Sequence, residues 1–132
     1  MKKIFLCLTL ALVSLLNYSC SKDDDDTNDP VCTISGGYTG TFSNPSGSGI
    51  FTYFFKENHF IEGSVKPSDP LVTFGSYDNT CETVTITTKH LTNGDYYRFD
   101  GKLSTDKLTI TGTYKNVTKP AETGPFTLTK IN

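Results

Sequence analysis

The feature that most constrains the fold is an alternation of apolar and polar side chains along most of the chain after residue 31. It is clearest at residues 107–114, where apolar residues or glycine hold the even positions and Thr109, Thr111 and Thr113 hold the odd ones. Side chains of a strand alternate between the two faces of a sheet, whereas a helix needs apolar residues three and four positions apart. No window of residues 31–132 has that helical spacing. The sequence therefore predicts an all-β fold.

The alternating pattern occurs in eight segments separated by turn residues. The predicted strands are residues 38–43, 49–56, 59–66, 71–77, 82–89, 96–103, 107–114 and 124–130. Glycine inside a strand marks a bend or bulge where a sheet curls. Such glycines are Gly40, Gly63, Gly75, Gly101 and Gly112. Short antiparallel strands with these bends predict an up-and-down β-barrel, whose interior is filled by side chains or holds one small ligand. A two-sheet β-sandwich is the alternative.

Charge separates the chain into segments and excludes one class of partner. Residues 31–132 hold nine Lys and Arg against nine Asp and Glu, so nothing there is basic enough to bind nucleic acid. Residues 20–30 are polar and acidic without apolar periodicity, which is typical of a flexible tether. We therefore expect an N-terminal segment at residues 1–19, a tether at residues 20–30 and one barrel domain at residues 31–132.

The N-terminal segment has the features of a cleaved export signal. Lys2 and Lys3 precede a mostly apolar run of thirteen residues at positions 4–16, which is short for a bilayer crossing. Ser19 then places a small residue directly before Cys20. With Cys20 as the residue that takes a lipid, the segment resembles the signal peptide of bacterial lipoproteins.

The residues after Cys20 extend this resemblance. They are Ser21, Lys22, Asp23, Asp24, Asp25 and Asp26. The run is similar to the leader that directs lipoproteins of the Bacteroidota to the outer face of the outer membrane. Asn17 stands where the usual signal has leucine, which resembles the looser signals of that phylum. The resemblance implies an outer-membrane protein that is held by a lipid anchor and exposed at the cell surface. A plain solvated run of charge is the alternative.

Two cysteines remain in the barrel domain, Cys32 and Cys81. An exported chain can keep a disulfide and an even count favours pairing, with two buried free thiols as the alternative. In a meander both cysteines fall at the end of the barrel that carries the short turns. A bridge would draw the N-terminal segment across that end, and the lipid tether would leave from the same end. The longer loops would then face away from the membrane.

Residues 40–48, Gly-Thr-Phe-Ser-Asn-Pro-Ser-Gly-Ser, resemble the first hairpin of the avidin family, one branch of the lipocalin-like (calycin) barrels. In that family the positions of Asn44 and Ser48 carry polar groups that bind biotin. The chain has no tryptophan, and Val65 stands where the family has a tyrosine, so biotin itself is not expected. The resemblance implies a calycin-like barrel with another ligand or with none.

Aromatic residues dominate the predicted inner face and either fill the barrel or form the mouth of a ligand site. They are Tyr38, Phe42, Phe51, Tyr53, Phe55, Phe74, Tyr97, Phe99, Tyr114 and Phe126. Tyr96 and Tyr114 adjoin the long loops, and a tyrosine offers an apolar body with a polar tip. With Asn44 and Ser48, they are the candidate ligand contacts.

These observations favour a non-catalytic binding module that takes a small apolar ligand or a glycan at the long-loop end. An accessory protein with a solid barrel, binding another envelope protein or a host protein, is the alternative. A hydrolase is the least expected class, because no nucleophile motif is present and His59 and His90 fall at opposite ends of the barrel. No metal or cofactor is expected.

Overall fold

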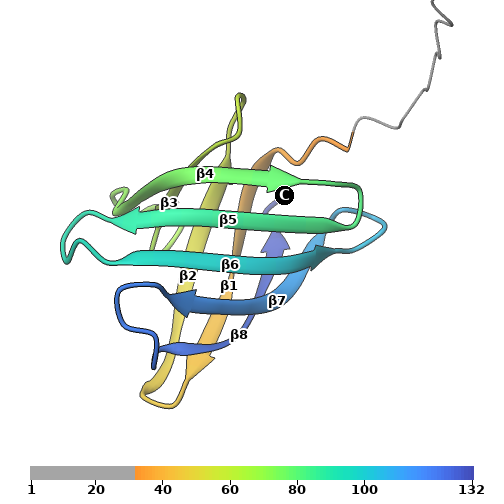
Figure 1. Cartoon of the computed structure of the whole chain (residues 1–132). Helices are drawn as coiled ribbons and strands as arrows, with labels where there is room; N and C mark the ends of the chain where they lie inside the picture. The colour runs from red at the N-terminus through yellow and green to blue at the C-terminus, as the bar shows by residue number, and fades with distance from the viewer. Residues whose placement is uncertain (1–31) are drawn as a thin grey trace, which may run out of the picture.

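The computed structural model describes residues 32–132, which form a closed barrel of eight antiparallel strands (Figure 1). The predicted up-and-down barrel is confirmed, and the two-sheet sandwich is wrong. The strands are β1 (Gly36–Asn44), β2 (Gly47–Phe55), β3 (Phe60–Ser64), β4 (Thr73–Asn79), β5 (Thr83–His90), β6 (Tyr96–Leu103), β7 (Thr109–Asn116) and β8 (Thr123–Lys130). Each differs from its predicted bounds by no more than two residues at either end. No helix in the described part of the chain has the length and apolarity of a membrane crossing.

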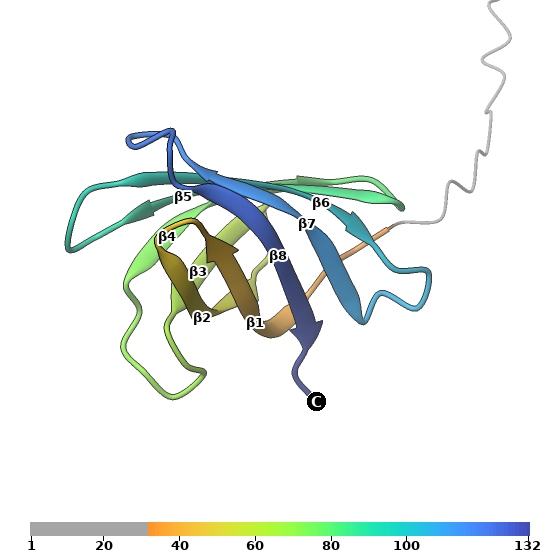
Figure 2. The ribbon, with the colours of Figure 1, turned by 90° about the horizontal axis from the view of Figure 1, so that it is seen from below.

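Each strand pairs with its neighbours in sequence, and β8 returns to β1 to close the ring. Figure 2 shows β1 and β8 side by side. Phe42 of β1 lies opposite Phe126 of β8, and Tyr38 lies opposite Lys130. Figure 1 shows β4 to β7 in front, crossing β1 and β2 behind them at a steep angle. The ring of strand pairs and the core lie wholly within residues 32–132, so this part of the chain holds every contact that closes the barrel.

The inner face carries the apolar residues that the alternation predicts. Tyr38, Ile61, Ile86 and Leu128 are fully buried. Nine of the ten predicted aromatics belong to this core or pack against it; the exception is Phe74. Phe74 is opposite Glu62 on β3 and its ring stacks on exposed Phe60, with 6.1 Å between ring centroids. It therefore faces outward, and the prediction for it was wrong, because Gly75 and not Phe74 holds the inward position in that part of β4.

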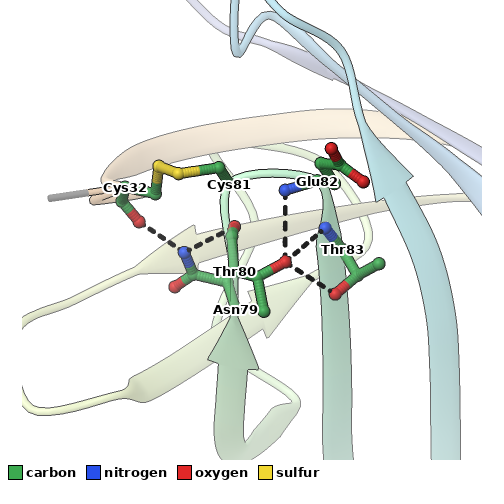
Figure 3. Close-up of a disulfide and its surroundings, with 6 residues drawn as sticks. All are labelled: Cys32, Asn79, Thr80, Cys81, Glu82 and Thr83. Atoms are coloured by element: carbon green, nitrogen blue, oxygen red, sulfur yellow. Dashed lines mark hydrogen bonds between the residues drawn. A yellow bond between two sulfur atoms is a disulfide. The ribbon is translucent and has the colours of Figure 1, made fainter. Parts of the chain in front are cut away.

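The short-turn end is closed by the segment that precedes β1. Ile34 is 2% exposed, and the hydroxyl of Tyr77 donates to its carbonyl oxygen at 3.3 Å. Cys32 and Cys81 are joined in a disulfide with 4.9 Å between their Cα atoms (Figure 3). The amide of Asn79 donates to the Cys32 carbonyl oxygen beside the bridge. The bridge and its position at this end agree with the sequence-based expectation.

Closing the ring brings neighbouring strands unusually close at Gly75 in β4. A Cβ atom built there would overlap the carbonyl oxygen of Thr87 on β5. That oxygen belongs to the backbone and cannot move without disturbing the pairing of β4 with β5. Any side chain at this position therefore overpacks the wall of the barrel.

We expect Gly75→Ala to lower the free energy of unfolding by about 2 kcal/mol, because the added methyl group forces β4 and β5 apart. Urea denaturation followed by circular dichroism measures the change. Ser76→Ala is the matched control, since Ser76 is exposed on the same strand and its loss should change stability by less than about 0.5 kcal/mol. Equal stability of the two variants would contradict the close approach.

Candidate functional site

A cavity of about 480 Å³ opens at the long-loop end of the barrel. Its wall comes from β1 to β7 and from the loops that follow β3 and β5. Most of the lining is aromatic or aliphatic, including Phe51, Tyr53, Phe99, Val65 and Val72. The volume falls in the range of small-molecule sites in proteins, which are concave and mostly apolar with a few polar groups.

A layer of aromatic rings forms the floor of the cavity. Phe51 stacks on Phe99 with 5.3 Å between centroids, and Tyr53 meets both rings edge-on. The hydroxyl of Tyr53 lies 3.0 Å from Oγ1 of Thr88, and burial raises the pKa of this tyrosine. Below this layer the barrel is filled by buried side chains such as Ile61 and Ile86. The interior is therefore packed at the short-turn end and hollow at the long-loop end.

Gly49 shapes one edge of the cavity mouth. A Cβ atom at this position would lie 2.7 Å from Cε1 of Phe42, which is closer than real Cβ contacts allow. The missing side chain lets the Phe42 ring lie across β2. The Phe42 ring meets the ring of Tyr114 on β7 edge-on, with 5.0 Å between the ring centroids. The ring of Phe42 thus forms the wall between the β1–β2 hairpin and β7.

Tyr114 is held at the cavity wall by Asn44. The amide nitrogen of Asn44 donates to the Tyr114 hydroxyl oxygen at 2.6 Å. The amide oxygen of Asn44 accepts from the backbone N–H of Ser46 at 2.8 Å, which fixes the orientation of the amide group. Burial raises the pKa of Tyr114, and the hydrogen bond from Asn44 opposes the shift. Tyr114 therefore stays a neutral phenol at physiological pH.

Tyr97 has a similar partner in Asn93. The amide oxygen of Asn93 accepts from the backbone N–H of Asp95 at 2.9 Å. Burial raises the pKa of Tyr97, and the side chain of Asn93 opposes that shift. A turn asparagine thus acts on each of the two tyrosines of the β6–β7 wall, through a direct hydrogen bond in the case of Tyr114.

A buried polar network ties the loops of this end together. Asp95, 4% exposed, accepts from Lys119 Nζ at 2.7 Å and from Asn116 Nδ2 at 3.0 Å. The amide oxygen of Asn116 accepts from the backbone N–H groups of Thr118 and Lys119. The hydrogen bond from Lys119, followed by that from Asn116, holds the pKa of Asp95 below its usual value. The network joins the β5–β6 loop to the β7–β8 loop.

The four predicted contact residues divide into two pairs. Asn44 and Tyr114 are joined by a hydrogen bond, and Tyr114 lines the cavity whereas Asn44 lies outside its lining. Ser48 is exposed and borders a shallower hollow along β1, β2 and β8 instead. Tyr96 is 46% exposed on the outer face, where Lys89 Nζ lies 5.3 Å from its ring centroid. The inward neighbour of Tyr96, Tyr97, lines the cavity in its place.

Sequence reasoning missed Asn93, His90 and the Asp95 network. The turn-forming runs Asn44-Pro45-Ser46 and Asn93-Gly94-Asp95 are visible in the sequence and indicate asparagines that accept from the backbone two residues later. His90 lines the cavity, and its Nδ1 accepts from the N–H of Thr92 at 3.2 Å, so the neutral ring carries its proton on Nε2. Nothing in the sequence pairs Asp95 with Lys119, which lies 24 residues further along the chain.

Comparison with protein-family models, curated proteins and solved structures found no match to this chain. The eight-stranded antiparallel barrel fits a calycin-like fold. Within residues 32–132, no three His, Cys, Asp or Glu side chains gather as a metal site would require. The predicted lipidation site at Cys20 and the leader at residues 21–26 lie outside the described residues.

We expect Asp95→Asn to destabilise the protein at pH 7, with a difference from wild type that narrows below about pH 4. An unfolded Asp titrates near pH 3.9 and the native carboxylate titrates lower, so its contribution is complete above the unfolded pKa and is lost as the pH falls through the native one. Urea denaturation from pH 7 to pH 2.5 measures this difference. Lys119→Met should show the same pH profile, because it removes the main partner. A difference that stays constant to pH 2.5 would contradict the assignment.

Proposed function

We propose that the protein is a lipid-anchored lipoprotein of the bacterial outer-membrane surface, of Bacteroidota type, whose barrel is a non-catalytic binding module for a small apolar molecule. The observation that carries the binding function is the cavity of about 480 Å³ at the long-loop end. The lining of this cavity comes from aromatic side chains that face the core of the barrel, and concave, mostly apolar sites are where proteins hold small ligands.

The lining favours an apolar molecule over a glycan. Phe51 and Phe99 offer flat apolar surface at the floor, and Val65 and Val72 offer aliphatic surface at the mouth. A sugar would bring many hydroxyl groups, and each would need a partner once it left water. The polar groups at this wall are few, so a mostly apolar molecule with few polar groups fits the cavity better than a sugar does.

The two ends of the barrel suit an anchored receptor. The described chain begins at Cys32, at the short-turn end, and the cavity opens at the other end. In this proposal the tether at residues 20–30 leaves from the closed end, and Cys20 carries the lipid. The open end then faces away from the membrane, where a ligand would arrive.

A protein partner is the second candidate function, and one observation favours it. Large apolar side chains are exposed around the open end: Ile50, Val65, Leu71, Leu91 and Val117, with Leu91 at 58% and Val117 at 50%. They come from β2 and from three separate loops. Contiguous exposed apolar surface marks interaction sites more often than isolated residues do.

We expect the chain from Ser21 onward, which contains the whole barrel and lacks the lipid-accepting cysteine, to bind the apolar fluorophore N-phenyl-1-naphthylamine saturably. Val72→Trp places a large ring in the cavity wall and should weaken binding tenfold or more, equivalent to about 1.4 kcal/mol. Fluorescence titration measures both affinities.

Val117→Trp is the matched control for this titration. Val117 is exposed at the same end of the barrel but does not line the cavity. The affinity of this variant for the fluorophore should therefore equal that of the wild type. Equal weakening in both variants, or no saturable binding by the wild type, would contradict a ligand-binding cavity.

The proposed location at the cell surface can be tested in whole cells. Replacing Asp23–Asp26 with alanine should leave the protein lipidated at Cys20 but protected from protease added outside, because the charged leader is lost. Cys20→Ser is the control that should abolish labelling by a fatty-acid analogue, while Cys7→Ser within the signal should not. Full external cleavage of the alanine variant would show that the leader is not a surface signal.

A further inference from the structure

The polar groups on the β6–β7 wall of the cavity are oriented before any ligand binds. Asn44 and Asn93 each accept a backbone N–H two residues later with the amide oxygen, at 2.8 Å and 2.9 Å. The amide nitrogen of Asn44 then donates to the Tyr114 hydroxyl at 2.6 Å, and the side chain of Asn93 acts on the Tyr97 hydroxyl, where it opposes the rise of the pKa. Rotating either amide would break its backbone hydrogen bond, so the orientation is fixed.

This arrangement determines what the tyrosines can offer. A phenol oxygen that already accepts an amide N–H keeps its own hydrogen to donate. His90 lines the same cavity and, with the Thr92 N–H at Nδ1, the neutral ring carries its hydrogen on Nε2. The β6–β7 wall and the end of β5 thus present hydrogen-bond donors.

The opposite character appears on the β3 side of the cavity. The Ser64 hydroxyl donates to the Lys66 carbonyl oxygen at 2.6 Å, so only its lone pairs remain for a ligand. A ligand with a single acceptor group is therefore favoured with that group toward the donors of β5, β6 and β7 and away from Ser64 on β3.

The charges around this wall disfavour an anion. Of the charged groups that act on the Tyr97 hydroxyl, Asp95 and Glu122 are negative and Lys119 is positive. Glu122 also acts on Tyr114. A carboxylate placed between the two tyrosines would meet more negative than positive charge, whereas an uncharged carbonyl oxygen accepts the same hydrogen bonds without repulsion.

We infer that the cavity selects an uncharged apolar molecule with one carbonyl group, such as an aryl ketone or an ester, whose oxygen accepts from Tyr97 and Tyr114. The inference rests on the proposed function, since it names the class of ligand for the same cavity. The cavity would then distinguish between ligands of equal size and apolarity, which its volume alone would not do.

The test is a competition series against N-phenyl-1-naphthylamine on the chain from Ser21 onward. 2-Acetylnaphthalene and 2-isopropenylnaphthalene have nearly the same shape, but only the first has a carbonyl oxygen. We expect the ketone to compete about fivefold better, the effect of one net hydrogen bond, and 2-naphthoate to compete less well than the ketone. Equal competition by the ketone and the alkene would overturn the inference, and so would tighter binding of the carboxylate.

Variants assign the preference to the two hydroxyls. The double variant Tyr97→Phe with Tyr114→Phe should still bind the fluorophore but lose the advantage of the ketone over the alkene. Tyr96→Phe removes an exposed hydroxyl outside the cavity and should keep that advantage. If the double variant keeps it as well, the tyrosines are not the donors.

The outcomes separate this inference from the proposed function. Failure of the fluorophore to bind the wild-type chain would refute the binding cavity itself. Saturable fluorophore binding together with indifference to the carbonyl would leave the cavity in place and refute only the ligand class.

Discussion

Pairing of β1 with β8 is the constraint on which the rest of this structure depends. It gives the outer strands of the meander partners for their backbone groups, so the sheet has no open edge. It also fixes which face of every strand points inward, because a shift of one residue would exchange the two faces. At Gly40 on β1 a Cβ atom would overlap the carbonyl oxygen of Thr127 on β8, so this pairing leaves no room for a side chain at that position.

The closed barrel has two ends, and one is filled by side chains whereas the other carries the cavity. At the short-turn end, Ile34 fills the opening and the Cys32–Cys81 bridge holds its segment in place. The bridge spans 49 residues, and closing a loop of that size stabilises a fold by about 4 kcal/mol in the chain-entropy model. At the other end the cavity lies between strand residues and the loops that follow β3 and β5. The hollow therefore lies at the end opposite the bridge, away from the point where residue 32 enters.

The barrel could be predicted from the sequence because the patterns that indicate it are local and recur along the chain. Alternation and turn spacing gave the strand count, and the strand count gave the end at which each loop lies. Phe74 shows where this fails: it lies in a short stretch in which a glycine takes the inward position, so aromatic character misleads. Tyr96 was chosen by its nearness to a loop and Ser48 by its place in the avidin-like hairpin, yet parity places both on the outer face.

The hollow itself could not be derived from the sequence. The inward rings are numerous enough to fill a small barrel, and whether they do depends on their rotamers. Phe51 and Phe99 stack as a floor and leave space above, an arrangement set by contacts between strands that are far apart in sequence. The Asp95–Lys119 pair depends in the same way on two loops that the pairing of β6 with β7 brings together.

The loop network and the turn asparagines together bear on how the cavity would recognise a ligand. Asp95 and Asn116 hold the β5–β6 and β7–β8 loops against each other, and those loops carry the residues beside Tyr97 and Tyr114. Asn44 donates to the Tyr114 hydroxyl, and Asn93 acts on the hydroxyl of Tyr97. Groups that are already ordered lose little entropy when a ligand arrives, so more of their interaction energy appears as affinity. The buried polar groups of this end thus serve orientation, and the apolar walls supply the main attraction for a ligand.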